Sequence, residues 1–211
     1  MGWIKTLVAT MALAVAGVAL AGSYDDALDA ASNGRTSALA GLLSRGIDPD
    51  TTDSNGNNLL MLAARDGHAD TVALLLKFRA SPLQRNLMGD SAPMLAALRG
   101  HREVVRAFIA SGRPLEADRW TPLMYAAFEG HDDIVADLLA AGATIDARAP
   151  NQATPLMLAA RNGHARAVEL LLAAGADPRL TNDRGQSAAE WALENGNDQI
   201  ATRIQSAAGK R

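Results

Sequence analysis

The sequence contains no cysteine, and only 4% of its 211 residues are aromatic. The absence of cysteine excludes disulfide bonds, thiolate metal sites and lipid attachment to a thiol. Positive charge is not in excess either, because the formal net charge is −3 and the lysines and arginines are spread along the chain. The composition therefore gives no indication of binding to nucleic acid or to an anionic membrane surface.

Groups that could carry out catalysis are not brought together by their spacing in the sequence. A nucleophile needs a base beside it, and a phosphate site of the common type needs a glycine-rich loop, which is absent from the sequence. Carboxylate pairs such as Asp132-Asp133 stand at the start of an expected helix, where they interact favourably with the helix dipole. We therefore expect a protein that is not an enzyme.

Residues 1–21 are predicted to be a cleavable secretory signal peptide. Lys5 gives a positive start, Leu7 to Leu20 is an uncharged run, and Ala19-Leu20-Ala21 fits a small-residue cleavage site. The alternative is a transmembrane anchor, but the run is shorter than the roughly 20 apolar residues that span a bilayer. No twin arginine is present, which favours the general secretory route. We expect a mature chain that begins at Gly22, resides in the periplasm and has no membrane contact after cleavage.

Residues 154–177 have the composition of a helix–turn–helix unit. Thr154 is suited to cap the first helix, and Pro155 follows at a position where its missing N–H costs nothing. Gly163 can adopt the left-handed conformation that ends this helix, and Gly175 can end the second. A unit of this size cannot bury its own apolar face, so it needs a copy of itself on each side.

The copies are present at a nearly constant spacing. The helix-ending glycine recurs as Gly34, Gly67, Gly100, Gly130, Gly163 and Gly196, which gives spacings of 33, 33, 30, 33 and 33 residues. Two units carry the pattern T-P-L-M-x-A, at residues 121–126 and 154–159. This period and content resemble the ankyrin repeat, whose signature includes T-P-L-H-x-A. The resemblance covers the chain after about residue 23, and it implies an all-α ankyrin-repeat solenoid of stacked helix-turn-helix units with short hairpin loops.

The resemblance divides residues 22–211 into about six repeats of one elongated domain. The expected boundaries are 23–50, 51–83, 84–115, 116–146, 147–179 and 180–211. The first and last repeats lack the Thr-Pro start, which suits capping repeats with one face in water. We expect the protein to be a monomer.

Methionine stands where the family usually has the histidine of T-P-L-H. The four positions are Met61, Met94, Met124 and Met157. We interpret these side chains as packing between repeats. The alternative is a thioether ladder that binds copper(I) or haem iron. Neighbouring repeats lie roughly 10 Å apart, however, and a single ion needs ligands within about 2.5 Å, so we expect no cofactor.

All four histidines follow a helix-ending glycine, at His68, His101, His131 and His164. A histidine at this place is normal for ankyrin repeats, and the resemblance assigns it to the turn between the two helices. The spacing between repeats that argues against a shared ion at the methionines applies equally to these rings.

For function, the resemblance implies protein binding through the hairpin tips and the exposed side of the first helices. The corresponding positions in this chain are Asn55, Asn57, Arg65, Asp66, Leu87, Met88, Asp90, Leu98, Arg99, Trp120, Phe128, Glu129, Arg161 and Asn162. The same register adds Ser54, Asp118, Asn151, Ala153, Arg184, Gln186 and Glu194. The contacts in the middle two repeats are largely apolar, and those in the outer repeats are polar. We expect a protein partner in the periplasm.

The connection from Ser111 to Trp120 is three residues shorter than its counterparts, because the glycine spacing there is 30. A shortened hairpin predicts a notch beside Leu87, Met88 and Trp120. The alternative is a deletion in a loop without functional consequence.

A cluster of Trp120, Phe128 and Leu98 is expected outside the core. Its rim would be Asp90, Arg99, Asp118 and Glu129, as in an interface hot spot. The alternative is that Trp120 folds back over the hairpin and is structural. Tyr125 and Trp191 are expected to face the core.

These features together predict a non-enzymatic adaptor in the periplasm. Bacterial periplasmic proteins with this kind of repeat have been linked to peroxide defence, so a stress-defence enzyme such as catalase is one partner that the resemblance implies. The alternative is a chaperone for haem, a metal or a small ligand, which would use the methionines or the notch.

Overall fold

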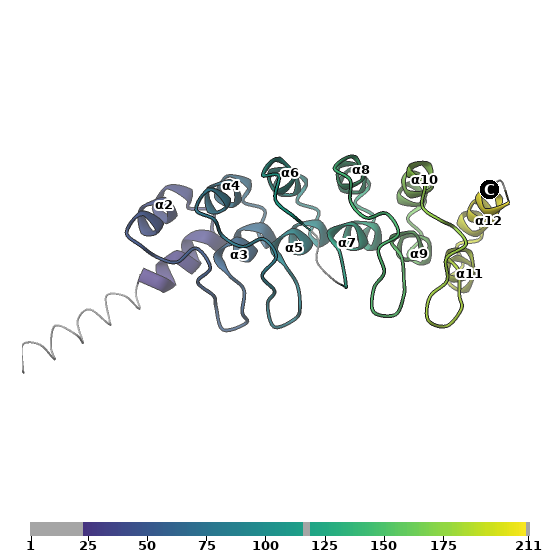
Figure 1. The fold of residues 1–211 in the computed structure, drawn as a ribbon, viewed down its shortest axis with the longest axis horizontal. Helices are drawn as coiled ribbons and strands as arrows, with labels where there is room; N and C mark the ends of the chain where they lie inside the picture. The colour runs from purple at the N-terminus through teal and green to yellow at the C-terminus, as the bar shows by residue number, and fades with distance from the viewer. Residues whose placement is uncertain (1–22, 116–118, 210–211) are drawn as a thin grey trace, which may run out of the picture.

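The computed structural model describes residues 23–115 and 119–209, which form an elongated row of helix pairs in two layers (Figure 1). The proposed signal peptide over residues 1–21 and the predicted contact residue Asp118 lie outside the described residues. One layer holds the first helices of the repeats: residues 23–32, α3 (Leu59–Arg65), α5 (Ala92–Leu98), α7 (Pro122–Glu129), α9 (Pro155–Arg161) and α11 (Ala188–Glu194). The other holds the second helices: α2 (Thr36–Ser44), α4 (Ala69–Lys77), α6 (Arg102–Ala110), α8 (Asp132–Ala140), α10 (Ala165–Ala174) and α12 (Asp198–Ala208).

Each repeat contacts its neighbours along the row. The first helices pack in sequence, α3 on α5, α5 on α7, α7 on α9 and α9 on α11. The second helices pack in the same order, and each first helix from α3 onward also contacts a second helix. Hairpin loops project from the side of the first helices (Figure 1). This arrangement confirms the all-α solenoid of helix-turn-helix units that the repeated glycines predict. In the described part of the chain, no helix combines the length and the hydropathy that a membrane span requires.

The first helices begin as their sequences indicate. The Thr154 hydroxyl accepts the Met157 N–H at 3.3 Å, and Pro155 occupies the first turn of α9. In the last repeat the Glu190 carboxylate accepts the Ser187 N–H at 2.7 Å, and the Ser187 hydroxyl accepts the Glu190 N–H in return. This capping box lowers the pKa of Glu190, because both the backbone and the side chain of Ser187 donate to its ionised form.

The core is built from alanine, leucine, valine and methionine. Paired alanines such as Ala159 and Ala160 are fully buried, which lets neighbouring first helices approach closely. The four methionines at the former histidine position are also buried, with exposed fractions of 0–1%. Their burial agrees with the interpretation that they pack between repeats.

The repeated histidine connects adjacent repeats. Each ring nitrogen Nε2 bonds to a carbonyl of the preceding repeat, as His164 does to the Phe128 oxygen at 2.9 Å. The His164 ring also lies close to Gly130, the helix-ending glycine of the preceding repeat. A Cβ on Gly130 would be 2.4 Å from Nδ1 of His164. Gly130 also has φ of 75°, so both the close approach of the ring and the left-handed backbone require glycine at this position. Each histidine stands in the turn between the two helices, as expected, but its side chain makes no capping bond to the helix that follows and contacts the preceding repeat instead.

A network of ion pairs joins α6 to α8 on the outer layer. Asp137 accepts bonds from the Nε atoms of Arg102 and Arg106 at 2.7 and 2.9 Å, and 19% of its side chain is exposed. These two guanidinium groups, Arg102 first, lower the pKa of Asp137 to about 2. The pKa lies below that of a free carboxylate, so the stabilisation is present above about pH 4 and is lost as the pH falls toward 2.

We expect Asp137→Asn to lower the free energy of unfolding at pH 7, because it removes the charge that pairs with Arg102 and Arg106. The decrease should be only about 1 kcal/mol, because solvent screens both arginines. At pH 2 only a small part of this difference should remain, since Asp137, with a pKa of about 2, is then about half protonated. Urea denaturation followed by circular dichroism between pH 2 and 7 measures both. A difference that stays constant over that range would show that the carboxylate charge is not the cause.

Candidate functional site

The hairpins between the repeats are held by short-range hydrogen bonds. In the second repeat Asp53 Oδ1 accepts the N–H groups of Asn55 and Asn57 at 2.8 Å, and Asn57 Nδ2 donates to Asp53 Oδ2 at 2.9 Å. Burial opposes ionisation of Asp53, but these bonds to the carboxylate outweigh it and lower the pKa of Asp53. The predicted contact residue Asn57 is 7% exposed and serves the hairpin itself, so its side chain is not available to a partner.

Two pairs of neighbouring hairpins are joined by a backbone hydrogen bond. The Leu87 N–H donates to the Asn55 carbonyl at 3.0 Å, and the Asp183 N–H donates to the Asn151 carbonyl at 3.1 Å. Pro150 occupies the equivalent position of the fifth repeat, thirteen residues before the helix-ending glycine. Because proline has no N–H, this bond from the fifth hairpin to the fourth cannot form. The row of hairpins is therefore interrupted beside the shortened connection.

An aromatic cluster lies at this interruption. The ring centroids of Trp120 and Tyr125 are 5.0 Å apart, and those of Trp120 and Phe128 are 6.2 Å apart with the rings edge to face. All three side chains are half-buried and pack against the core. We expected Trp120 and Phe128 to lie outside the core, and this expectation was wrong, because both rings pack against it. The contact between the rings also removes part of their apolar surface from water. Tyr125 is half-buried rather than fully in the core, whereas Trp191 is 8% exposed as expected.

Asp90 is tied to this cluster by a hydrogen bond. The Tyr125 hydroxyl donates to Asp90 Oδ1 at 2.6 Å. Burial is the largest cause that raises the pKa of Tyr125, and the hydrogen bond to the Asp90 carboxylate is the next largest. The tyrosine therefore stays protonated as a donor, and Asp90 has one carboxylate oxygen engaged within the protein.

The two most exposed of the large apolar side chains in the described residues are adjacent in the chain, and one of them lies beside the cluster. Leu87 is 79% exposed and Met88 is 84% exposed, both at the tip of the third hairpin. A small cavity of about 120 Å³ lies beside them, and Met88, Arg119, Trp120, Tyr125 and Pro150 help to line it. This cavity, called the notch below, lies beside Met88 and Trp120, two of the three residues where the shortened connection predicts a hollow. Leu87 does not line it, because its side chain lies over the second hairpin, where a Cβ on Gly56 would be 3.5 Å from Leu87 Cγ.

The remaining predicted contact residues differ in their exposure to solvent and in whether their side chains are already paired. The Arg65 guanidinium pairs with the Asp66 carboxylate through two bonds of 2.9 and 2.8 Å, and this pairing is the first cause that lowers the pKa of Asp66. Leu98 is half-buried. The exposed residues of the predicted set are Ser54, Asn55, Leu87, Met88, Arg99, Glu129, Asn151, Arg161, Asn162, Arg184 and Glu194. The prediction was wrong for Ala153, whose side chain is fully buried and cannot contact a partner. The face is therefore apolar at the third and fourth repeats and polar on either side.

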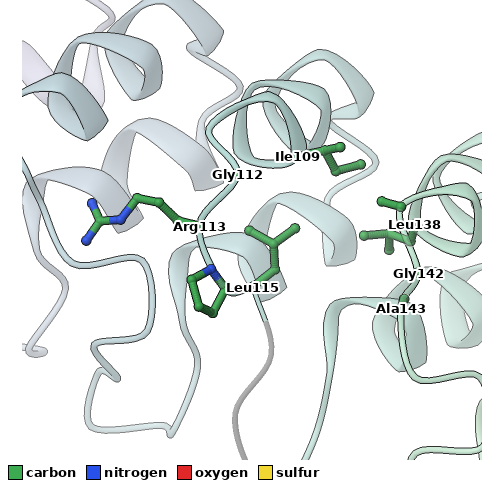
Figure 2. A pocket seen from close by; sticks show the side chains of 9 residues that line it. Ile109, Gly112, Arg113, Leu115, Leu138, Gly142 and Ala143 are labelled. Carbon is green, nitrogen blue, oxygen red and sulfur yellow. The ribbon is translucent and has the colours of Figure 1, made fainter.

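A second pocket lies outside the predicted face, between the C-terminal ends of α6 and α8. It has a volume of about 400 Å³. Figure 2 shows Ile109, Leu115 and Leu138 turned toward one hollow, while Arg113 points away. Arg113 Nη1 donates to the Ala80 carbonyl of the preceding repeat at 2.7 Å, which holds the charge away from the apolar side chains. The sequence contained one signal for this pocket, the shortened connection after Ser111, but not the side of the repeat on which it opens.

In the part of the chain that the structure describes, metal-binding side chains do not gather on either face. Within the described residues, no group of three or more histidine, aspartate or glutamate side chains is arranged to hold an ion. The four histidines are each engaged with a carbonyl of the preceding repeat.

Comparison with known protein families agrees with the geometry. The family model for ankyrin repeats matches the chain three times, over residues 28–112, 79–149 and 123–208. No curated protein matches the chain. Ankyrin repeats are in general non-enzymatic modules that bind other proteins.

Proposed function

The chain belongs to the ankyrin repeat family, and we propose that it is a periplasmic adaptor that binds a partner protein through the hairpins and first helices of its third to fifth repeats. The single observation that carries this assignment is the exposure of the adjacent residues Leu87 and Met88, of which Met88 lies beside the Trp120 cluster. Soluble proteins rarely leave contiguous large apolar side chains in water unless a partner covers them.

The composition of this face suits a protein partner. Tryptophan and tyrosine with adjacent arginines are the residue types enriched in interface hot spots. Met88 is flexible and polarisable, which lets it adapt to the shape of an opposing surface. The exposed Arg99 and Glu129 provide a polar rim on the same face.

The location in the periplasm rests on the sequence of residues 1–21. If those residues are a signal peptide, protein recovered from the periplasm begins at Gly22, and its intact mass is lower by the mass of residues 1–21. Full-length protein retained in the membrane would contradict this. By analogy with other periplasmic members, a stress-defence enzyme such as catalase is the first partner class to test.

Capture of the partner tests the function directly. An affinity-tagged copy is crosslinked in the periplasm, and the recovered proteins are identified by mass spectrometry. Met88→Glu should remove the specific partner, because it places a charge in the apolar centre of the face. Phe78→Glu is the matched control, since Phe78 is also an exposed apolar residue but lies at the end of α4, in the other layer. Equal recovery with both variants would contradict the assignment of the face.

The apolar pocket of Figure 2 supports a second candidate, the binding of a small apolar ligand. Protein purified from the periplasm and examined by native mass spectrometry would carry a bound molecule if this is correct. An absorption spectrum and elemental analysis test the haem or metal version of this alternative.

A further inference from the structure

A polar pocket of about 310 Å³ lies at the C-terminal end of the same face, between the first helices α9 and α11. Arg161, Arg184, Gln186, Trp191 and Glu194 line it. We infer that this pocket binds the side-chain carboxylate of an aspartate or glutamate in the partner, and so selects an acidic segment. The inference rests on the proposed function, and it adds the chemistry by which the partner is recognised.

Arg161 is held in place by an aromatic platform. Its guanidinium carbon lies 5.5 Å from the ring centroid of Trp191. The indole is itself fixed, because it is 8% exposed and its Nε1–H donates to Gln186 Oε1 at 3.0 Å. A guanidinium stacked on a ring keeps its N–H groups in its own plane, where they can donate to a planar carboxylate in two parallel bonds.

The equivalent arginine of the second repeat shows what is missing here. Arg65 also stands two residues before the helix-ending glycine, and its two bonds go to the adjacent Asp66. In the fifth repeat the adjacent residue is Asn162, whose amide donates to the Phe128 carbonyl at 2.7 Å. Within residues 23–115 and 119–209, no carboxylate pairs with Arg161 or with Arg184. A carboxylate from a partner would supply what Asp66 supplies to Arg65.

The charge of the pocket matches a single carboxylate. Two arginines and one glutamate give a net charge of +1, and Glu194 is already engaged by the Gln186 amide. A carboxylate neutralises this charge, whereas a phosphate dianion would leave an excess of negative charge beside Glu194. The backbone N–H groups of Arg184 and Gln186 in the hairpin are not available to a ligand, because both donate to Asn182 Oδ1. Recognition of a C-terminal carboxylate typically uses free backbone N–H groups, so side-chain donors favour an internal acidic residue.

Acetate is a probe that tests this pocket without the partner. We expect acetate to shift the Nε–H nuclear magnetic resonance signal of Arg161 saturably in the millimolar range, and acetamide, its neutral analogue, to leave the signal unchanged. Arg184→Gln should weaken acetate binding about tenfold. Arg45→Gln, at an exposed arginine of the first repeat, should have no effect. Equal shifts at Arg161 and at Arg45 in the native protein would indicate general charge attraction and overturn the inference.

Peptides distinguish the possible sources of the carboxylate. The capped peptide acetyl-Gly-Glu-Gly-amide should bind at Arg161, whereas acetyl-Gly-Gly-Gly with a free C-terminus and inorganic phosphate should bind at least about fivefold more weakly. Tighter binding of either of these two would overturn the assignment to an acidic side chain. Arg161→Lys keeps the charge but loses the planar donor pair, so it should weaken the glutamate peptide about tenfold.

The same variant separates this inference from the proposed function. If a captured partner binds Arg161→Lys as tightly as the native protein, the face is correct but the carboxylate pocket is not used. If no partner is captured at all, the acetate and peptide measurements still decide whether the pocket binds a carboxylate.

Discussion

Replacing Met157 with alanine is expected to lower the free energy of unfolding by about 2–5 kcal/mol. Met157 is 1% exposed, in the first turn of α9, where it packs between adjacent repeats. Truncation removes buried apolar surface and leaves a cavity that the stacked helices cannot fill, and both effects destabilise the protein. Urea denaturation followed by circular dichroism at 222 nm, the usual helix wavelength, measures the change.

The leucine variant is the control for the role of the sulfur atom. Met157→Leu conserves volume and should change the free energy of unfolding by less than about 1.5 kcal/mol. Met94→Leu should cost more than Met157→Leu, because the Met94 sulfur accepts the buried N–H of Ser91 at 3.3 Å and leucine leaves that donor unpaired. If Met157→Leu folds normally but abolishes partner capture, the thioether has a function beyond packing.

The sequence was sufficient for the fold because several local signals agree with one another. Thr154 and Pro155 start a helix and Gly163 ends it, and the same signals recur in register along the chain. A unit of two short helices has only one way to bury its apolar face, which is to stack on a copy. The histidines show the limit of this reasoning. Their position was clear, but the bond from His164 to the preceding repeat depends on the distance between repeats.

The candidate site was only partly predictable for a similar reason. The register placed the predicted contact residues along one side of the solenoid, and the short connection after Ser111 predicted a notch there. The sequence could not show that Arg65 and Asp66 form an ion pair, or that Arg161 lies over Trp191. Such pairings depend on which rotamers the packed structure allows. Arg65 and Arg161 therefore occupy the same position of the repeat but differ in their availability to a partner.

Replacing Trp120 with alanine is expected to weaken partner binding by about 2 kcal/mol or more, the usual threshold of a hot spot. Trp120 contacts Tyr125 and Phe128 and lines the notch beside Met88, so its loss removes both a contact and the support of the surrounding surface. The same contacts within the protein mean that stability should also fall, by about 1–2 kcal/mol for the lost ring pairs. Isothermal titration calorimetry with the identified partner gives the affinity, and thermal denaturation gives the stability.

Two further variants separate binding from folding. Met88→Ala should weaken binding without changing the melting temperature, because 84% of the Met88 side chain is exposed in the free protein. Trp120→Phe should restore most of the stability, since an aromatic ring still packs on Tyr125, but only part of the affinity. If Trp120→Ala lowers stability while Met88→Ala leaves the affinity unchanged, the aromatic cluster is structural, and the partner binds elsewhere on the solenoid.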